Sequence, residues 1–131
     1  SRQSIFDGVP AAFPALSYAV TLQRKASKIG FDWPDASGPL SKIAEEAAEL
    51  TSAAGAADAR ATSDELGDLL FAVVNVARHL GVDPEVALRA AAQKFRSRVA
   101  AVEQLAAERR IDVAAAGPEL LDQLWNEVKL G

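Results

Sequence analysis

Proline and glycine stand mainly between long segments of this chain, and their spacing restricts its fold more than any other feature of the sequence. Proline is favoured in the first turn of a helix and glycine just after its last turn. No stretch shows the alternation of apolar and polar residues that is typical of a strand. The sequence therefore predicts an all-α chain, with an irregular arm over residues 1–13 and helices over residues 14–30, 39–55, 64–80, 84–110 and from 118 to near the C-terminus.

Composition supports the same fold class. Half of the residues are hydrophobic, and alanine, which is the best helix former and a poor strand former, supplies much of that fraction. A chain of 131 residues is long enough for one domain with its own core and short for two. We expect a single domain over residues 1–131.

The residue types also exclude several kinds of site. The absence of cysteine excludes disulfides, thiolate metal sites and a cysteine nucleophile. The single histidine, His79, excludes a zinc site with several histidine ligands from one chain. A metal bound here would have oxygen ligands, which points to magnesium, manganese or calcium.

Net charge and hydropathy limit the partners. A formal charge of −4 argues against a general nucleic-acid-binding surface, which needs a basic face. We find no signal peptide and no apolar run long enough to span a bilayer, so we expect a soluble cytoplasmic protein with no membrane partner.

The expected helix over residues 64–80 is apolar over most of its circumference. On a helical wheel of about 100° per residue, its polar stripe is narrow and contains Glu65, Asp68, Asn75 and His79. A helix of this kind has to be covered on more than one side. A homodimer would cover it more easily than one small bundle, although burial within a single bundle remains the alternative.

Acidic residues gather on two of the expected helices. Glu45, Glu46 and Glu49 share one arc of the first, and Glu65 and Asp68 share a face of the next. If the two helices pack antiparallel, as their short connection suggests, these acids could surround a small space. Like charges about 4 Å apart repel by roughly 1 kcal/mol in water and about 4 kcal/mol at an effective dielectric of 20. The acids must therefore face water or enclose cations.

Spacing alone leaves simpler interpretations open. The three glutamates of "SKIAEEAAEL" could form the solvated face of an alanine-rich helix. Glu65 could complete a capping box with Thr62, in which it would only satisfy backbone donors.

Longer motifs resemble a known family. The patterns E-E-x-x-E and E-x-x-D, together with "RKASKIGFDWPDASGPLSKIAEEAAEL", "DELGDLLFAVVNVARHLGVDPEVALRAAAQKFRSR" and "LLDQLWNEVK", are similar to the C-terminal catalytic domain of the MazG nucleoside triphosphate pyrophosphohydrolases, within the all-α NTP pyrophosphatase superfamily. The resemblance covers roughly residues 5–130. It implies a four-helix-bundle-like fold with a short extra C-terminal helix, assembled as a homodimer or a dimer of dimers.

The resemblance also implies an activity and a cofactor. The expected reaction is hydrolysis of a nucleoside triphosphate to the monophosphate and pyrophosphate, by attack of water at the α-phosphorus, in nucleotide-pool housecleaning. Mg²⁺ is the expected cofactor, with Mn²⁺ as a substitute. Glu46, Glu49, Glu65 and Asp68 would hold the metal, and Glu45 would be a further ligand or would orient the attacking water.

A second set of residues would contact the substrate if the resemblance holds. Basic side chains would meet the phosphates, a polar side chain on the acidic stripe would touch the substrate, and two aromatic side chains would shape the base pocket. The basic residues are Lys42, Lys94 and Arg98, the polar residue is Asn75, and the aromatic residues are Phe31 and Trp33.

Most of these side chains have a structural alternative. Lys42 could pair with Glu45 or Glu46, and Trp33 could plug the core over a loop. Residues 94 and 98 could form a solvated basic face. For His79 we favour a structural or supporting role.

The sequence also departs from the family. Relatives often carry Asn where this chain has Ala92, and sometimes a basic residue near Thr62. These differences affect the expected base contacts and substrate affinity.

Two other functions remain open at this stage. A related all-α pyrophosphohydrolase could have a narrower substrate, such as dUTP, dCTP or phosphoribosyl-ATP, although the "GFDWPD" loop favours the broader enzyme. A non-catalytic helical dimer could use the same fold. The complete set of acids argues against it, since a site without function has no reason to tolerate repelling charges.

Overall fold

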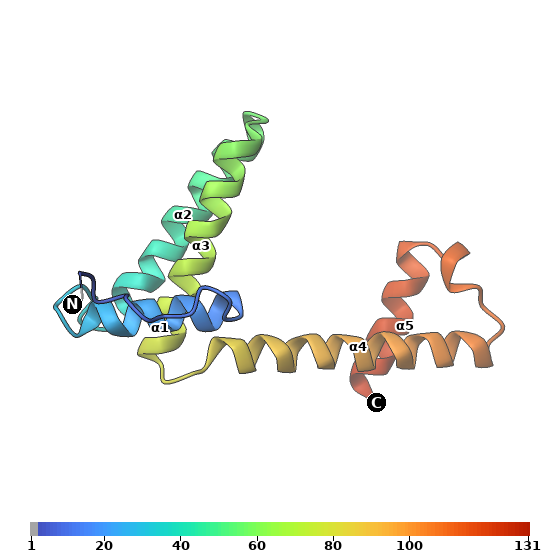
Figure 1. The fold of residues 1–131 in the computed structure, drawn as a ribbon. Coiled ribbons are helices and arrows are strands. Elements are labelled where there is room, and N and C mark those ends of the chain that lie inside the picture. Colours follow the sequence, from blue (N-terminus) through green and yellow to red (C-terminus); the bar gives the residue numbers. More distant parts are fainter. Residues whose placement is uncertain (1–2) are drawn as a thin grey trace. The chain divides into compact units, whose positions relative to one another are not determined.

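The computed structural model describes residues 3–131, and every regular element within that range is a helix (Figure 1). None of these helices is long and apolar enough to cross a membrane. The all-α prediction is confirmed. The helices are α1 (Ala15–Ser27), α2 (Ser37–Gly55), α3 (Ala59–His79), α4 (Pro84–Glu108) and α5 (Pro118–Leu130), with a short 3-10 helix, η1 (Val113–Ala115), before α5.

Several helices begin within two residues of a proline. Pro14 is the N-cap of α1, and Pro118 is the first residue of α5. α2 begins at Ser37, two residues before the predicted Pro39, because the first-turn N–H groups of a helix need no partner within it and proline is tolerated there. α1 ends at Ser27, earlier than predicted, and is followed by a turn that reaches Gly30.

The start of α3 corrects the sequence interpretation. The helix begins at Ala59 rather than near residue 64, because Asp58 is its N-cap and accepts a hydrogen bond from the Ala61 N–H at 3.1 Å. Thr62 therefore lies inside the first turn, where its hydroxyl donates to the Asp58 carbonyl at 2.7 Å. The capping box of Thr62 and Glu65 is wrong, and the Glu65 carboxylate is not used as a cap.

α2 and α3 form an antiparallel hairpin, and their ribbons run side by side along its length (Figure 1). The connection between them is short, and Ala57 within it adopts a positive φ of 55°. α1 packs against α3, and Val20 of α1 is buried. Gln23 of α1 is also buried, and its side-chain amide donates to the Phe71 carbonyl of α3 at 3.1 Å. The hairpin and α1 thus fix the positions of the predicted acids.

The chain forms two compact units, one up to Glu85 and one from Val86 onward. The second unit has its own apolar core, where α4 and α5 pack together around Val102, Ala106 and Leu124. Outside this core the Arg109 guanidinium donates to both carboxylate oxygens of Glu127, at 2.7 and 3.0 Å. Our expectation of a single domain stays a prediction.

α3 carries apolar side chains that the chain does not bury. Leu66, Leu70 and Val73 are 45%, 50% and 42% exposed. A Cβ atom added to Gly67 would meet no atom within 4 Å, so α3 is also open at this position. The predicted homodimer would cover such a surface, and it stays a prediction.

Candidate metal centre

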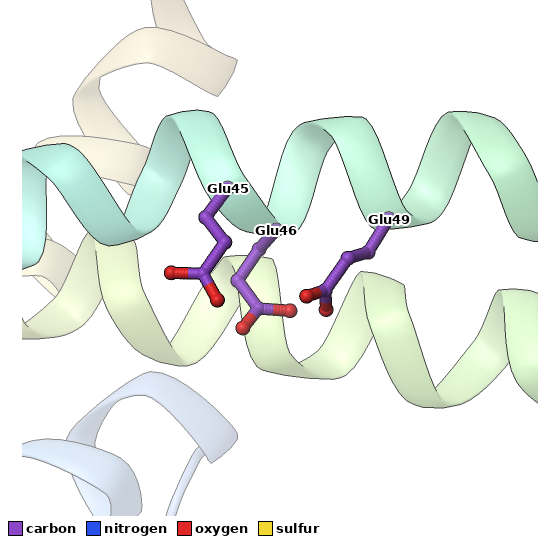
Figure 2. Close-up of side chains that lie close together, drawn as sticks. All are labelled: Glu45, Glu46 and Glu49. Atoms are coloured by element: carbon purple, nitrogen blue, oxygen red, sulfur yellow. The ribbon is translucent and has the colours of Figure 1, made fainter.

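The acids of the two hairpin helices converge. Glu45, Glu46 and Glu49 lie on the same side of α2 (Figure 2), and each offers a carboxylate oxygen within 4.8 Å of the others. Glu65 and Asp68 of α3 form a second group of this size with Glu46. Glu46 therefore joins the two groups, and the predicted convergence of acids from neighbouring helices is confirmed.

Burial singles out two of these carboxylates. Glu46 is 4% exposed and Glu65 is half-buried, and the Oε2 atom of each is buried without a hydrogen-bond partner. A buried polar atom without a partner is costly, and few occur in a native structure. The solvated-face interpretation is thus wrong for Glu46, whereas Glu45 and Glu49 are exposed.

The proximity of the carboxylates shifts their protonation. The Glu46 carboxylate, then the Glu49 carboxylate and burial, raise the pKa of Glu65 to about 7. Burial acts to raise the pKa of Glu46, but the neighbouring Glu65 carboxyl and the Lys42 ammonium hold that pKa below its ordinary value. Without a cation, Glu65 therefore keeps its proton at pH values below about 7, where Glu46 already carries a negative charge.

Lys42 lies beside this cluster, one turn before Glu45 on α2. Its Nζ atom is 3.2 Å from Glu45 Oε1 and 3.3 Å from Glu46 Oε1, so the ion pair expected as the structural alternative is present. These two carboxylates raise the pKa of Lys42, with the hydrogen bond to Glu45 as the largest cause. The ammonium neutralises only part of the negative charge of the cluster.

The donor set fits a hard divalent cation. All the available ligand atoms are carboxylate oxygens, which magnesium, manganese and calcium prefer. The unpartnered Oε2 atoms of Glu46 and Glu65 are two such ligands that the protein itself leaves unsatisfied. Acidic clusters on the protein surface are common, but a cluster with buried unpartnered oxygens has a physical need for a positive partner.

Two hollows share a wall, and the smaller is lined by two of the five acids. The smaller, of about 310 Å³, is lined by Lys42, Glu46, Asp68 and Ala72, and by three residues that also line the larger. The larger, of about 560 Å³, is mainly apolar. The shared residues are Trp33, Phe71 and Asn75.

The MazG nucleotide pyrophosphohydrolase domain matches residues 38–102, a range that contains all five acids. The chain belongs to the MazG family. Nearly all of α2 and all of α3 lie within the match, so the hairpin that carries the acids belongs to the matched MazG domain.

Individual relatives agree with this match. The nucleoside triphosphate pyrophosphohydrolase of Escherichia coli K12 is 37% identical across 98% of this chain, which covers 50% of that protein. The nucleoside triphosphate pyrophosphohydrolase/pyrophosphatase MazG of Thermotoga maritima is 44% identical across 90% of this chain, which covers 45% of that protein. The uncharacterized protein YabN of Bacillus subtilis is 44% identical across 98% of this chain, and the chain covers 27% of YabN. The chain thus spans half or less of the length of these relatives.

The aromatic residues assigned to a base pocket by resemblance to MazG lie at the hollows. Trp33 is 42% exposed and lines both hollows, so it does not plug the core as the alternative supposed. A Cβ atom on Gly38 would overlap the Trp33 ring, so only glycine leaves room for the ring in this arrangement. Phe31 is 74% exposed and lines the larger hollow but not the smaller one. Asn75 lies on the wall that both hollows share.

The two basic residues assigned to the triphosphate lie on α4, in the second compact unit. Lys94 is exposed. The Arg98 guanidinium stands 5.8 Å from the centre of the Trp125 ring. The Phe95 ring centre lies 5.9 Å from that of Trp125. Trp125 packs against the core of that unit. The phosphate role of Lys94 and Arg98 in a MazG site stays a prediction.

Sequence reasoning missed one polar group that lines the larger hollow. Arg78 donates to both carboxylate oxygens of Asp32, with Nη1 3.0 Å from Oδ2, and His79 Nε2 lies 3.0 Å from Asp32 Oδ1. His79 therefore has the supporting role that we favoured. The available signal for Arg78 was its place on an apolar arc of its helix, beside Phe71 and Val74, where a charge needs a partner.

Proposed function

We propose that this chain hydrolyses nucleoside triphosphates to nucleoside monophosphates and pyrophosphate, by attack of water at the α-phosphorus, with Mg²⁺ or Mn²⁺ as cofactor. The observation that carries the proposal is the pair of buried carboxylate oxygens, Glu46 Oε2 and Glu65 Oε2, without partners inside a cluster of five acids. The MazG domain and the names of the two relatives from E. coli and T. maritima support the same reaction class.

The acids have distinct positions for this chemistry. Glu46, Glu65 and Asp68 form the group that spans both helices, so we assign them to the cation together with the exposed Glu49. When bound, a divalent cation neutralises phosphate charge and lowers the pKa of water. Glu45 is exposed beside the group, which suits a further ligand or a carboxylate that accepts a hydrogen bond from the attacking water.

Lys42 supplies positive charge at the edge of the smaller hollow. In the free protein its ammonium contacts Glu45 and Glu46, and a phosphate oxygen can replace one of these partners when substrate is bound. A positive group fixed at this place stabilises negative charge that develops on the departing pyrophosphate. We also keep Lys94 and Arg98 as proposed phosphate contacts.

The larger hollow suits the nucleoside. Its apolar lining includes Phe31, Trp33 and Phe71, whose rings can pack against a base. Through Asn75 it shares a wall with the smaller hollow, which Glu46 and Asp68 line. A nucleotide that placed its base there would direct its phosphates toward the cluster. We propose further that the active protein is a homodimer, which would cover the exposed apolar surface of α3.

The function is tested with a panel of standard and damaged nucleoside triphosphates and Mg²⁺, assayed separately for pyrophosphate and for orthophosphate. We expect pyrophosphate and the monophosphate in equal amounts. Release of orthophosphate alone would exclude attack at the α-phosphorus. Turnover restricted to dUTP or dCTP would place the protein with the narrower pyrophosphohydrolases.

A further inference from the structure

Arg78 connects three elements at the wall of the larger hollow. From α3 its Nε atom donates to Gln23 Oε1 of α1 at 3.3 Å, and its Nη1 atom donates to Asp32 Oδ2 of the loop between α1 and α2 at 3.0 Å. Its Nη2 atom donates to the other Asp32 oxygen and to Asn75 Oδ1, the latter at 3.0 Å. The Arg78 side chain is only 11% exposed, while the Asp32 side chain that it contacts is 22% exposed.

These contacts fix the orientation of the Asn75 carboxamide. A guanidinium has donors and no acceptor, so only the oxygen of an amide can face it. Because Asn75 Oδ1 faces Arg78, the Nδ2 group is the end that remains for other partners, and it has none among the described residues. Asn75 lines both hollows. The Asn75 side chain therefore has its donor group, Nδ2, available at the wall that the two hollows share.

The same guanidinium also holds the loop that carries the aromatic wall. The Asp32 carboxylate accepts hydrogen bonds from both terminal nitrogens of Arg78. Its Oδ1 atom also accepts a hydrogen bond from the Trp33 backbone N–H at 2.8 Å. The Trp33 ring then packs on Gly38 at the start of α2. Arg78 is thus linked to both polar and aromatic parts of the wall, although it is not a member of the acidic cluster.

We propose that Arg78 is a positioning residue for substrate binding, which acts by holding the Asn75 Nδ2 group toward a hydrogen-bond acceptor of the nucleotide. The proposal rests on the proposed function for the nature of the ligand. The acceptor is a carbonyl or ring oxygen of the nucleoside, or a phosphate oxygen. A nucleotide that presents only a donor at this place binds less tightly, because the Arg78 contact prevents the amide from reversing.

The test is a double-mutant cycle on nucleotide affinity. Wild type, Asn75→Ala, Arg78→Lys and the double variant are titrated calorimetrically with Mg²⁺ and a triphosphate whose α,β-bridging oxygen is replaced by methylene, which cannot release pyrophosphate. Lysine keeps the charge opposite Asp32 but lacks the planar fork that reaches Gln23 and Asn75 together. Arg109→Lys, at the bidentate pair with Glu127 in the second unit, is the matched control.

We expect Asn75→Ala and Arg78→Lys each to raise the Kd by roughly fivefold to tenfold, the worth of one hydrogen bond. The double variant should bind no more weakly than Asn75→Ala alone, since Arg78 acts through Asn75. Arg109→Lys should leave the Kd unchanged. Steady-state turnover of Arg78→Lys should show a raised KM with kcat changed by less than about threefold.

Three results would overturn the proposal. If the increases in Kd of the two single variants multiply in the double variant, Arg78 acts independently of Asn75. Unchanged affinity in Arg78→Lys would remove its role altogether, and so would the absence of nucleotide binding by the wild type. Wild type that binds the analogue but releases no pyrophosphate from hydrolysable triphosphates would refute the proposed function while the cycle still decides the role of Arg78.

Discussion

Glu46 of α2 and Glu65 of α3 belong to one group of carboxylates whose oxygens lie within 4.8 Å, and each buries an Oε2 atom without a hydrogen-bond partner. Two carboxylates so close cannot both be ionised without a large repulsion. In the free protein a proton on Glu65 relieves this repulsion, and the pKa of Glu65 is accordingly raised to about 7. A divalent cation would replace that proton and satisfy both oxygens.

The first prediction concerns stabilisation by the cation. We expect Mg²⁺ or Mn²⁺ at millimolar concentration to raise the thermal midpoint by several degrees, because a ligand that binds only the folded state adds about 2.7 kcal/mol at a hundred times its Kd. Differential scanning calorimetry measures the shift. Glu46→Gln should lose it, while Glu103→Gln, an exposed acid on α4, should keep it. An unchanged midpoint of the wild type would favour a non-catalytic helical module.

The second prediction concerns pH. The folded pKa of Glu65, about 7, lies above its ordinary value of 4.5, so the folded state binds this proton more tightly than the unfolded state. Its contribution to stability is therefore fully present below about pH 4.5 and is lost as the pH rises to about 7. Glu46 acts in the opposite sense, but its stabilisation is lost only as the pH falls through its lowered pKa, outside this window.

We therefore expect the thermal midpoint of the chelator-treated protein to fall between about pH 5 and pH 8. The charged groups around Glu65 are the carboxylates of Glu46, Glu49 and Asp68, with Lys42 on the other side of Glu46. Glu65→Gln should flatten the profile, and saturating Mg²⁺ should flatten it in the wild type. A midpoint that rises across this range in the chelator-treated wild type would contradict the assignment.

The acidic site could be predicted largely from residue spacing. Glu45, Glu46 and Glu49 must share a face once they are helical, and a short connection makes the next helix antiparallel, which brings Glu65 and Asp68 close. Spacing could not show that Glu46 is buried while Glu45 is exposed. That difference depends on how α3 packs against α2.

Other features depend on competition between local signals or on distant contacts. Asp58 and Thr62 are both good helix caps, and the sequence alone did not show that the first of them starts α3. The contact between Arg78 and Asp32 joins residues 46 apart in the chain. No local pattern specifies it, because the conformation of the loop is set by α1 and α3 together.

The third prediction isolates one proposed ligand. Glu49→Gln keeps the shape of the side chain and removes its charge, so we expect turnover to fall by at least about 100-fold if Glu49 binds the cation. Because Glu49 is exposed and its charge repels Glu65, the free energy of unfolding without metal should not fall by more than about 0.5 kcal/mol. Pyrophosphate release and urea unfolding measure the two effects, with Glu103→Gln as the control. Full activity in the variant would remove Glu49 from the metal site.

The fourth prediction concerns assembly. Leu66, Leu70 and Val73 leave an apolar surface on α3 that is 42–50% exposed in the chain alone. We expect sedimentation velocity to show a dimer or a larger even-numbered assembly, because burying this surface removes apolar area from water. Leu70→Glu should shift the distribution toward the monomer, since an unpaired carboxylate in an apolar interface is strongly unfavourable.

Leu130→Glu is the matched control for the assembly prediction. Leu130 is 90% exposed near the C-terminus, so the same change there should leave the sedimentation coefficient as it is in the wild type. If Leu70→Glu reduces both assembly and pyrophosphate release, the α3 surface supports the active form. A wild type that sediments as a monomer at every concentration, or a Leu70→Glu variant that assembles like the wild type, would show that this surface is not the contact between copies.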